Sequence, residues 1–537
     1  MTLRQRTFAA AATVVALLLA GCTSSVKEST GSSTQGSNPD SNTVQAVDPA
    51  GFDDYYNQEI NWEKCDADQV VSPMMQAPSD ISSYECATLQ APMNWDDPDS
   101  EPIELAVARY TGKKLDKKLP PLFFNLGGPG GGAVDSLASF VENILTPQMA
   151  QKYQTIALDP RGVGASSPIW CLTDEERDES LAEFTDTEDW STEQLVALYQ
   201  DDTAEFGNQC LERNGEILGY VDSDSATRDF DMVRSALGAE TIDYLGFSYG
   251  TVLGAIYADL FPGRVGHFVL DGAVDPSLNI NELSALQIEG MEKSLYHWIE
   301  ECEAESNCPL SGGLEGGKEQ MIEFFDQVSE NPIPTSDPDR PLDGAMARTA
   351  VIGSLYSTEL YPLLSQSVRM AMNGDGSAMQ FLADYFNDRG DDGVYISNSS
   401  DAFMAVNMLD YEPVGTPEEW QATYDELVEK YPVVGSDFGL ASAGMDKWPV
   451  ETRALRQKVT AKGAGEILVI GTTNDPATPY VMAEALADAL EGGVLITVEG
   501  WDHTAYSNAA DPCVTGAVDN FMLNGTIPED GLVCPGE

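Results

Sequence analysis

The pentapeptide GFSYG at residues 246–250 lies between two segments of different character. Residues 241–245 are predicted to form a short buried strand. Residues 251–260 have the apolar spacing of a helix, which ends at the Phe-Pro-Gly of residues 261–263. Strand, tight turn and helix in this order are the context of a G-x-S-x-G nucleophile elbow, whose flanking glycines permit a strained serine. We therefore predict that Ser248 is a nucleophile; a structural Gly-Ser turn is the alternative.

A catalytic serine needs hydrogen-bond donors for the negative oxygen of its intermediate, and a glycine-rich loop could supply one. Residues 122–126 are predicted to form a strand that runs into Gly-Gly-Pro-Gly-Gly-Gly at residues 127–132, where the backbone can approach a substrate closely. We predict that the donors are the amides of Gly128 and of Tyr249, the residue after the nucleophile. A phosphate-binding loop is the alternative, but the Gly-Lys-Ser/Thr ending of a P-loop is missing.

Three histidines compete for the role of general base. His267 lies in a predicted strand and His297 in the middle of a predicted helix, so both are expected to be structural. His503 follows the strand predicted for residues 494–498 and a short turn. That is the late loop position which the chain order serine, acid, histidine requires. We predict His503 as the base.

The acid that orients the base should also lie at the end of a strand. Asp475 follows the strand predicted for residues 467–470. Its carboxylate would accept the Nδ1 hydrogen of His503, which leaves Nε2 free to take the proton of Ser248. Asp271 also ends a predicted strand and is the alternative, although its Asp-Gly sequence is equally typical of a turn. We favour Asp475.

The first 22 residues have the character of an export signal. Two arginines precede an apolar run at residues 8–20, which is too short to span a membrane and closes on Leu-Ala-Gly-Cys at residues 19–22. We predict a signal peptide over residues 1–22 and a lipid on Cys22 that holds the protein on the outer face of the cytoplasmic membrane. Residues 23–50, rich in Ser, Thr, Gly and Asn, are expected to form a flexible tether. An ordinary cleaved signal is the alternative.

Cysteine usage agrees with an exported protein. Without Cys22, eight of the nine cysteines remain. Eight cysteines allow 105 pairings, so an assignment rests on short loops and local closure. We expect four disulfides between sequence neighbours: Cys65 with Cys86, Cys171 with Cys210, Cys302 with Cys308, and Cys513 with Cys534. Since there is no Cys-x-x-Cys pair and only three histidines, we predict neither a metal site nor a cofactor.

The formal charge of −60 results from 88 acidic and 28 basic residues spread along the chain. This balance excludes nucleic-acid binding, because phosphate contacts require clustered lysines and arginines. Solubility is the simpler explanation of the charge. The alternative is that some of the acids lie in a cleft and receive the positive N-terminus of a substrate.

The interval between Asp271 and residue 467 is too long for a loop. It has helical patterns at residues 283–301, 317–329, 349–373, 377–387 and 418–429. We predict a core from residues 51–275 and 456–537 and a helical cap from residues 276–455 that narrows the mouth of the site. A narrow mouth favours action on chain ends. Asp410 and Glu289 are our candidates for binding a substrate ammonium; the alternative is that both are solvated surface acids.

Several motifs occur together in one order: GGPGG at residues 127–131, DPRGVGAS at 159–166, GFSYG, FPGRV at 261–265, LDG at 270–272 and DPATP at 475–479. Together they resemble the proline iminopeptidase and tripeptidyl aminopeptidase group of α/β-hydrolases, especially the secreted actinobacterial tripeptidyl aminopeptidases and their lipoprotein relatives. The similarity extends from about residue 61 to 535. It implies an α/β-hydrolase fold with a mostly helical cap after the sixth strand. It also implies a serine exopeptidase acting on peptides with free N-termini through Ser248, Asp475 and His503, with Gly128 and Tyr249 as oxyanion donors.

The chain departs from this group at two places. Leu126 stands where the single-chain iminopeptidases have a histidine, which affects only the packing of the glycine loop. Met408 and Met445 stand where the secreted relatives have two cysteines, and we predict a thioether contact in place of that disulfide. A carboxylesterase or lipase with the same triad, and a binding lipoprotein without activity, are the alternative functions. In the absence of a coiled coil or an internal repeat, we expect a monomer.

Overall fold

The computed structural model describes residues 48–72, 80–112, 119–182, 191–438, 440–453 and 456–536. The predicted signal, Cys22 and nearly all of the predicted tether lie outside these residues. Within them, no helix combines the length and the apolar character needed to cross a membrane.

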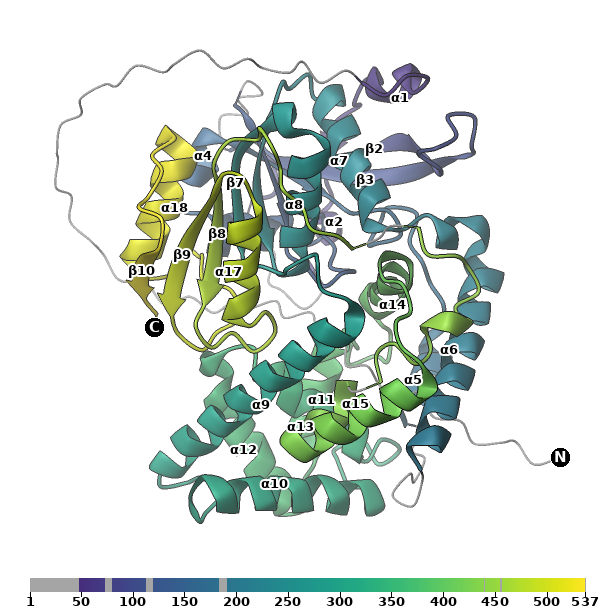
Figure 1. The fold of residues 1–537 in the computed structure, drawn as a ribbon, viewed down its shortest axis with the longest axis vertical. Coiled ribbons are helices and arrows are strands. Elements are labelled where there is room, and N and C mark those ends of the chain that lie inside the picture. The colour runs from purple at the N-terminus through teal and green to yellow at the C-terminus, as the bar shows by residue number, and fades with distance from the viewer. Residues whose placement is uncertain are drawn as a thin grey trace.

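A mixed β-sheet of ten described strands forms the centre of the molecule (Figure 1). Strands β1 to β3 are antiparallel, and β5 pairs with β3 in antiparallel fashion. The seven strands β4 to β10 are parallel to one another. In sheet order the strands are β1 (Glu63–Lys64), β2 (Tyr84–Pro92), β3 (Pro102–Tyr110), β5 (Gln154–Leu158), β4 (Pro121–Asn125), β6 (Ile242–Phe247), β7 (Val265–Asp271), β8 (Ile467–Thr472), β9 (Gly493–Glu499) and β10 (Leu532–Pro535).

Apolar cores cover both faces of the sheet, because successive residues of a strand point to opposite sides. In β8, Ile467 and Val469 belong to one core while Leu468 and Ile470 belong to the other. Helices α7 (Ser223–Ala236), α8 (Tyr249–Leu260) and α17 (Tyr480–Ala489) pack into the first core. The second core is covered by α3 (Leu137–Ser139), a π-helical turn (Phe140–Ile144), α4 (Met149–Lys152) and α18 (Pro512–Asn524). Buried strands with helices on both faces are the architecture of an α/β-hydrolase, as predicted.

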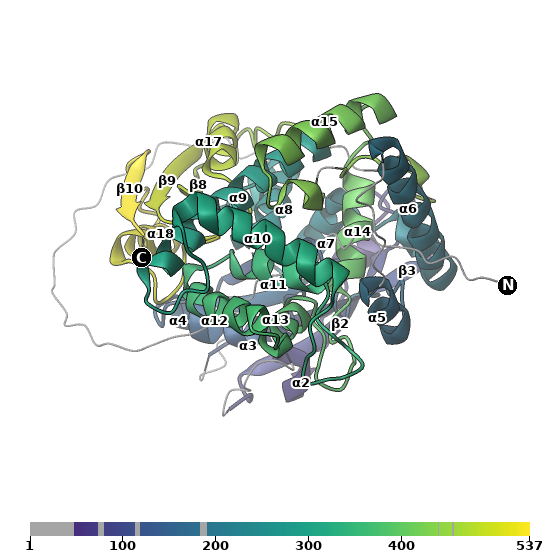
Figure 2. The same ribbon diagram turned by 90° about the horizontal axis from the view of Figure 1, so that it is seen from below.

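A helical cap is inserted between β7 and β8, the sixth and seventh strands when the two-residue β1 is left out. It has a separate apolar core, and its helices lie below the sheet in Figure 1 and in front of it in Figure 2. Its helices are α9 (Ile280–Ala304), α10 (Gly313–Glu330), α11 (Gly344–Ser354), α12 (Tyr361–Met372), α13 (Ser377–Phe386), α14 (Ser399–Asp410), α15 (Pro417–Lys430) and α16 (Gly435–Phe438), with short 3₁₀ turns at Thr358–Leu360 and Met445–Lys447.

Two details of the cap differ from the sequence prediction. The single helix predicted for residues 349–373 is split into α11 and α12, because Pro362 lies in the first turn of α12 and has no amide to continue a helix through it. Helix α14 was not predicted, although Ala402, Ala405 and Leu409 give it a buried face at helical spacing.

The segment between β5 and β6 also contributes to the cap, which the predicted domain boundaries did not anticipate. Its helix α5 (Asp174–Ala182) contacts α14 through the Arg177–Asp401 ion pair, and its helix α6 (Thr192–Asn214) packs against α15 (Figures 1 and 2). Val196 of α6 shares a small apolar cluster with Trp420 of α15 and with Leu440. The cap is therefore built from two separate parts of the chain.

Four disulfides connect Cys65 to Cys86, Cys171 to Cys210, Cys302 to Cys308, and Cys513 to Cys534, the pairs expected from the sequence. The Cys171–Cys210 bond joins the end of α6 to the segment before α5, and the Cys513–Cys534 bond joins α18 to β10. The remaining short elements are α1 (Asp53–Tyr56), α2 (Ala67–Val70) and 3₁₀ turns at Gly215–Gly219 and Pro262–Arg264.

Candidate active site

Ser248 lies on a sharp turn between β6 and α8, the context predicted for a nucleophile elbow. Its backbone has φ 55° and ψ −126°, an unusual conformation for a residue with a side chain. The flanking glycines are required by close packing. A Cβ on Gly246 would lie 2.5 Å from the Gly250 carbonyl oxygen, and one on Gly250 would lie 2.4 Å from that of Asn125. The Ser248 amide donates to the Asp271 carbonyl oxygen at 2.9 Å, which fixes the turn to β7.

The glycine loop after β4 packs directly against this turn. Gly127 has φ +105°, and a Cβ there would lie 2.8 Å from the Ser248 Cβ and 3.2 Å from the Tyr249 amide nitrogen. Gly128 follows, and its bond to Pro129 is cis. Within the described part of the chain, the Gly128 and Tyr249 amides donate to no acceptor. Both residues border the same pocket as Ser248, so both amides are available to a negatively charged oxygen.

Asp475 and His503 are brought together as predicted. The His503 Nδ1 lies 2.9 Å from Asp475 Oδ1 and 3.0 Å from Oδ2. The carboxylate is fixed by the amides of Ala477 and Thr478, at 2.9 and 2.8 Å, and by the Thr478 hydroxyl at 2.9 Å. Burial of the imidazole opposes its charge, but the Asp475 carboxylate outweighs that effect and raises the pKa of His503 above its ordinary value.

Asp271, the alternative acid, binds the backbone of the His503 loop and not the His503 imidazole. Its carboxylate accepts the amides of Ala505 and Tyr506 at 2.9 and 2.7 Å and so holds the loop that carries His503. Burial raises the pKa of Asp271 to about 6. Its neighbour Gly272 lies beneath the imidazole, since a Cβ there would be 3.2 Å from the His503 Cε1.

The Ser248 hydroxyl has no hydrogen bond to His503 within the described residues. The two side chains nevertheless belong to neighbouring loops, because Ser248 is bonded to Asp271 and His503 lies over Gly272. Hydrogen bonds between nucleophile and base are often long in enzymes without substrate and shorten on binding.

The other two histidines contact different residues. The His267 Nδ1 is 3.2 Å from Asp243 Oδ1, and His297 stacks on Trp501. In the described ranges, no group of three or more His, Cys, Asp or Glu side chains could hold a metal ion.

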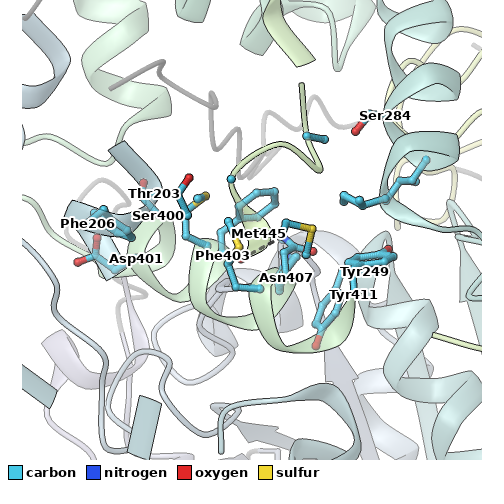
Figure 3. Close-up of a pocket in the computed structure, with 18 of the residues that line it drawn as sticks. Thr203, Phe206, Tyr249, Ser284, Ser400, Asp401, Phe403, Asn407, Tyr411 and Met445 are labelled. Carbon is cyan, nitrogen blue, oxygen red and sulfur yellow. Dashed lines mark hydrogen bonds between the residues drawn. The ribbon is translucent and has the colours of Figure 1, made fainter. Parts of the chain in front are cut away.

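Ser248 opens onto a pocket of about 290 Å³ between the core and the cap. Its walls come from α5, α6, α8, α9, α14 and the segment around Met445 (Figure 3). Most of the lining is apolar, including Phe206, Leu283 and Phe403. Figure 3 shows Tyr249 and Tyr411 at one end of the view, and Phe206, Ser400 and Asp401 at the other.

Comparison with known proteins finds relatives along most of the chain. A family model described as TAP-like protein matches residues 431–534, which include Asp475 and His503. The chain is 31% identical to Serine protease Hip1 of Mycobacterium tuberculosis (strain ATCC 25618 / H37Rv), over 89% of this chain and 91% of that protein. It is 32% identical to Carboxylesterase B of the same organism, over 85% and 87%. It is 27% identical to Tripeptidyl aminopeptidase of Streptomyces lividans, over 88% and 86%.

The chain belongs to the tripeptidyl aminopeptidase group of α/β-hydrolases. As a member of this group it is a serine hydrolase. The similarity covers the core and the cap alike, since it extends over more than four fifths of the chain.

Two cap residues predicted to bind a substrate ammonium do not line the pocket of this hydrolase. Asp410 is fully buried behind it. Its carboxylate forms an ion pair with Arg456 at 3.0 Å and accepts the Ser223 amide at 2.9 Å as well as the Ser223 hydroxyl. Glu289 is partly exposed on α9, where it pairs with Lys293 at 2.6 Å and accepts the Tyr431 hydroxyl at 2.8 Å. The prediction for both residues is corrected, because neither carboxylate borders the pocket and each already has partners in the protein.

Two other carboxylates, which the sequence analysis missed, border the pocket: Asp202 of α6 and Asp401 of α14. Asp401 is fully buried, and its Oδ2 accepts the Cys171 amide at 2.8 Å and pairs with Arg177 at 2.6 Å. Sequence patterns gave no signal for these residues, because the segments between β5 and β6 and between β7 and β8 meet only in the folded cap.

Met408 and Met445 are both buried and border the same pocket, which is consistent with the predicted thioether contact between them. The contact itself stays a prediction.

Proposed function

We propose that this hydrolase is a serine exopeptidase that releases short peptides from the free N-termini of polypeptides. One observation carries the proposal: the nucleophile elbow and the Asp475–His503 pair lie on neighbouring loops beneath a cap, and Ser248 borders a small apolar pocket between cap and core. Two relatives named as a serine protease and a tripeptidyl aminopeptidase support peptide chemistry. A covered pocket favours chain ends, since a folded protein cannot enter it.

In the proposed reaction, Ser248 Oγ attacks the carbonyl carbon of the scissile peptide bond while His503 Nε2 accepts the hydroxyl proton. The resulting negative oxygen accepts hydrogen bonds from the Gly128 and Tyr249 amides. The His503 imidazolium then gives its proton to the departing amine, and the carbon–nitrogen bond breaks. Water, deprotonated by the same imidazole, hydrolyses the acyl-enzyme and releases the N-terminal peptide. Asp475 stabilises the imidazolium throughout.

The substrate ammonium would bind at the end of the pocket where Asp202 and Asp401 lie. Asp401 Oδ1 is buried and has no hydrogen-bond partner in the described part of the chain. A positively charged N-terminus could therefore bind this oxygen without displacing the Arg177 contact on Oδ2. Such a site would select free N-termini over blocked ones.

A carboxylesterase is the second candidate, because acyl transfer to serine does not require an amide and one relative is named Carboxylesterase B. The two functions differ in whether the pocket prefers a free amine.

We further propose that the mature protein is a monomer, anchored through lipid on Cys22 to the outer face of the cytoplasmic membrane. The Leu-Ala-Gly-Cys sequence that ends at Cys22 and the four disulfides support an extracytoplasmic location.

The test is mass spectrometry of the products that the mature protein and its Ser248→Ala variant release from one oligopeptide, offered with a free and with an acetylated N-terminus. We expect di- or tripeptides from the free peptide only, and only with Ser248 present. Ser248-dependent hydrolysis of a short acyl ester, with neither peptide cleaved, would favour the esterase instead.

A further inference from the structure

Arg456 borders the pocket that Ser248 and Tyr249 also line, but its guanidinium has no part in the reaction described above. Its side chain is only 6% exposed, and its Nη2 pairs with Asp410 Oδ2 at 3.0 Å. The Nε and Nη1 atoms are buried and have no hydrogen-bond partner in the described part of the chain. Three of the five N–H bonds of this group therefore lack an acceptor.

Unpaired donors of this kind are rare in folded proteins, because a buried N–H without an acceptor loses the hydrogen bond that it makes to water in the unfolded chain. Arg177, the other arginine that borders the pocket, forms an ion pair with a carboxylate that also borders it, Asp401, although its Nη2 lacks a hydrogen bond of good geometry among the described residues. The partner of Arg456, in contrast, lies outside the pocket. An acceptor supplied by the ligand would satisfy the unused donors.

Arg456 is held against two tyrosine rings. The guanidinium carbon lies 4.8 Å from the ring centre of Tyr411 and 5.7 Å from that of Tyr249, the residue after the nucleophile. The Tyr249 hydroxyl is 2.6 Å from the Ser223 hydroxyl, and Ser223 in turn donates to Asp410. The ion pair, Ser223 and Tyr249 thus form one buried network that fixes the guanidinium near the turn.

We propose that Arg456 is a substrate-binding residue that donates hydrogen bonds to a main-chain carbonyl oxygen of the peptide segment to be released. This assignment rests on the proposed exopeptidase function. Asp410 already balances the charge of Arg456, so the group offers directed donors with little net charge, which suits a neutral carbonyl better than a carboxylate. Val274, Met404 and Met408, which line the same pocket, are apolar and suit the rest of a peptide.

The test compares two substrates that share the reaction but differ in inner carbonyl groups. Ala-Ala-Ala-p-nitroanilide has two main-chain carbonyls besides the scissile one, and p-nitrophenyl acetate has none. The variant is Arg456→Met combined with Asp410→Asn, which avoids leaving a buried carboxylate unpaired. Arg453→Met is the matched control, because Arg453 is an arginine three positions away that pairs with Asp96 and does not border the pocket.

We expect the double variant to lower kcat/KM for the tripeptide substrate by about 10- to 100-fold, the effect of losing hydrogen bonds from a charged group. Hydrolysis of the acetate should change less than about threefold, and Arg453→Met should leave both rates within about twofold. Arg456→Lys should recover only part of the loss, because its donors do not form a planar fork. Thermal unfolding of each variant shows whether the fold is intact.

Three results would overturn the assignment. Equal losses on both substrates would show that Arg456 only supports the elbow. The wild-type protein could instead prefer Glu over Gln at the residue before the cut, with that preference lost in the double variant. This result would show that the guanidinium binds a side-chain carboxylate of the substrate. A wild-type protein that hydrolyses the acetate but no free peptide would overturn the proposed function, and the carbonyl assignment with it.

Discussion

The imidazole of His297 and the indole of Trp501 stack with ring centres 3.9 Å apart and planes 12° apart. This contact joins helix α9 of the cap to the loop that carries His503. Two hydrogen bonds strengthen the connection: the Thr358 amide donates to Asp502 Oδ1 at 2.7 Å, and the His503 amide donates to the Tyr356 carbonyl oxygen at 2.9 Å. The cap therefore positions the proposed base as well as covering the pocket.

Replacing His297 by alanine is expected to lower kcat by about three- to tenfold and to leave KM within about twofold. The stacked pair contributes roughly 0.5–1.5 kcal/mol, and its loss would loosen the loop of His503 without touching the pocket. Steady-state kinetics on a tripeptide substrate measures the effect. His267→Ala is the control, because His267 contacts Asp243 and Phe521 far along the sheet. Equal losses in the two variants, or a change in KM alone, would contradict this role for the stack.

The proposed general base gives the reaction a defined pH dependence. Because the Asp475 carboxylate raises the pKa of His503, the imidazole stays protonated, and unable to accept a proton, to a higher pH than an ordinary histidine. We expect kcat/KM to rise with pH, with a midpoint above 6.5, the ordinary histidine value. Asp475→Asn should shift the midpoint downward and reduce kcat about a thousandfold or more. An unchanged midpoint in that variant would contradict the pairing.

The catalytic candidates could be predicted from sequence because each depends on local pattern. Ser248, Asp475 and His503 each follow a predicted strand directly or through a short turn, and parallel strands bring their carboxyl ends to one edge of the sheet. The chain order of the three then restricted the choice. Asp271 was a reasonable competitor by the same rule, and the structure shows it holding the His503 loop instead.

The lining of the pocket could not be predicted in this way. Asp401 and Arg456 border it only because the segment between β5 and β6, helix α14 and the return to β8 pack against one another. The spacing of apolar residues within one segment does not predict how that segment packs against the other two. Asp410 illustrates the difficulty, since an acid near the end of a cap helix is as compatible with a buried ion pair as with a substrate site.

Asp135 is expected to make stability depend on pH. Burial, and then the neighbouring Asp159 carboxylate, raise the pKa of Asp135 to about 7. An unfolded aspartate titrates near 3.9, so between about pH 4 and 7 the folded state holds a proton that the unfolded state has lost. Stability therefore falls as pH rises through this range.

Asp135→Asn removes that titration, so its urea midpoint relative to wild type should be higher at pH 8 than at pH 5. Asp375→Asn is the control. Bonds from Ser377 lower the pKa of that exposed carboxyl, so it is ionised at both pH values and its variant should show the same difference at each. Parallel behaviour of the two variants would contradict the titration assigned to Asp135.

Gly127→Ala is expected to reduce kcat by about a hundredfold or more. The new Cβ would lie 2.8 Å from both the Phe247 carbonyl oxygen and the Ser248 Cβ, and the backbone there has φ +105°. The loop would have to move away from the elbow, which would take the Gly128 amide from the forming oxyanion, and loss of one such donor costs about 10²–10³ in kcat. Gly516→Ala is the matched control, because a Cβ at that position in α18 meets nothing within 4 Å. It should keep full activity and gain about 0.5–1 kcal/mol of stability. If Gly127→Ala retained wild-type kcat, the loop would not supply the donor, and the Tyr249 amide would have to stabilise the oxyanion alone.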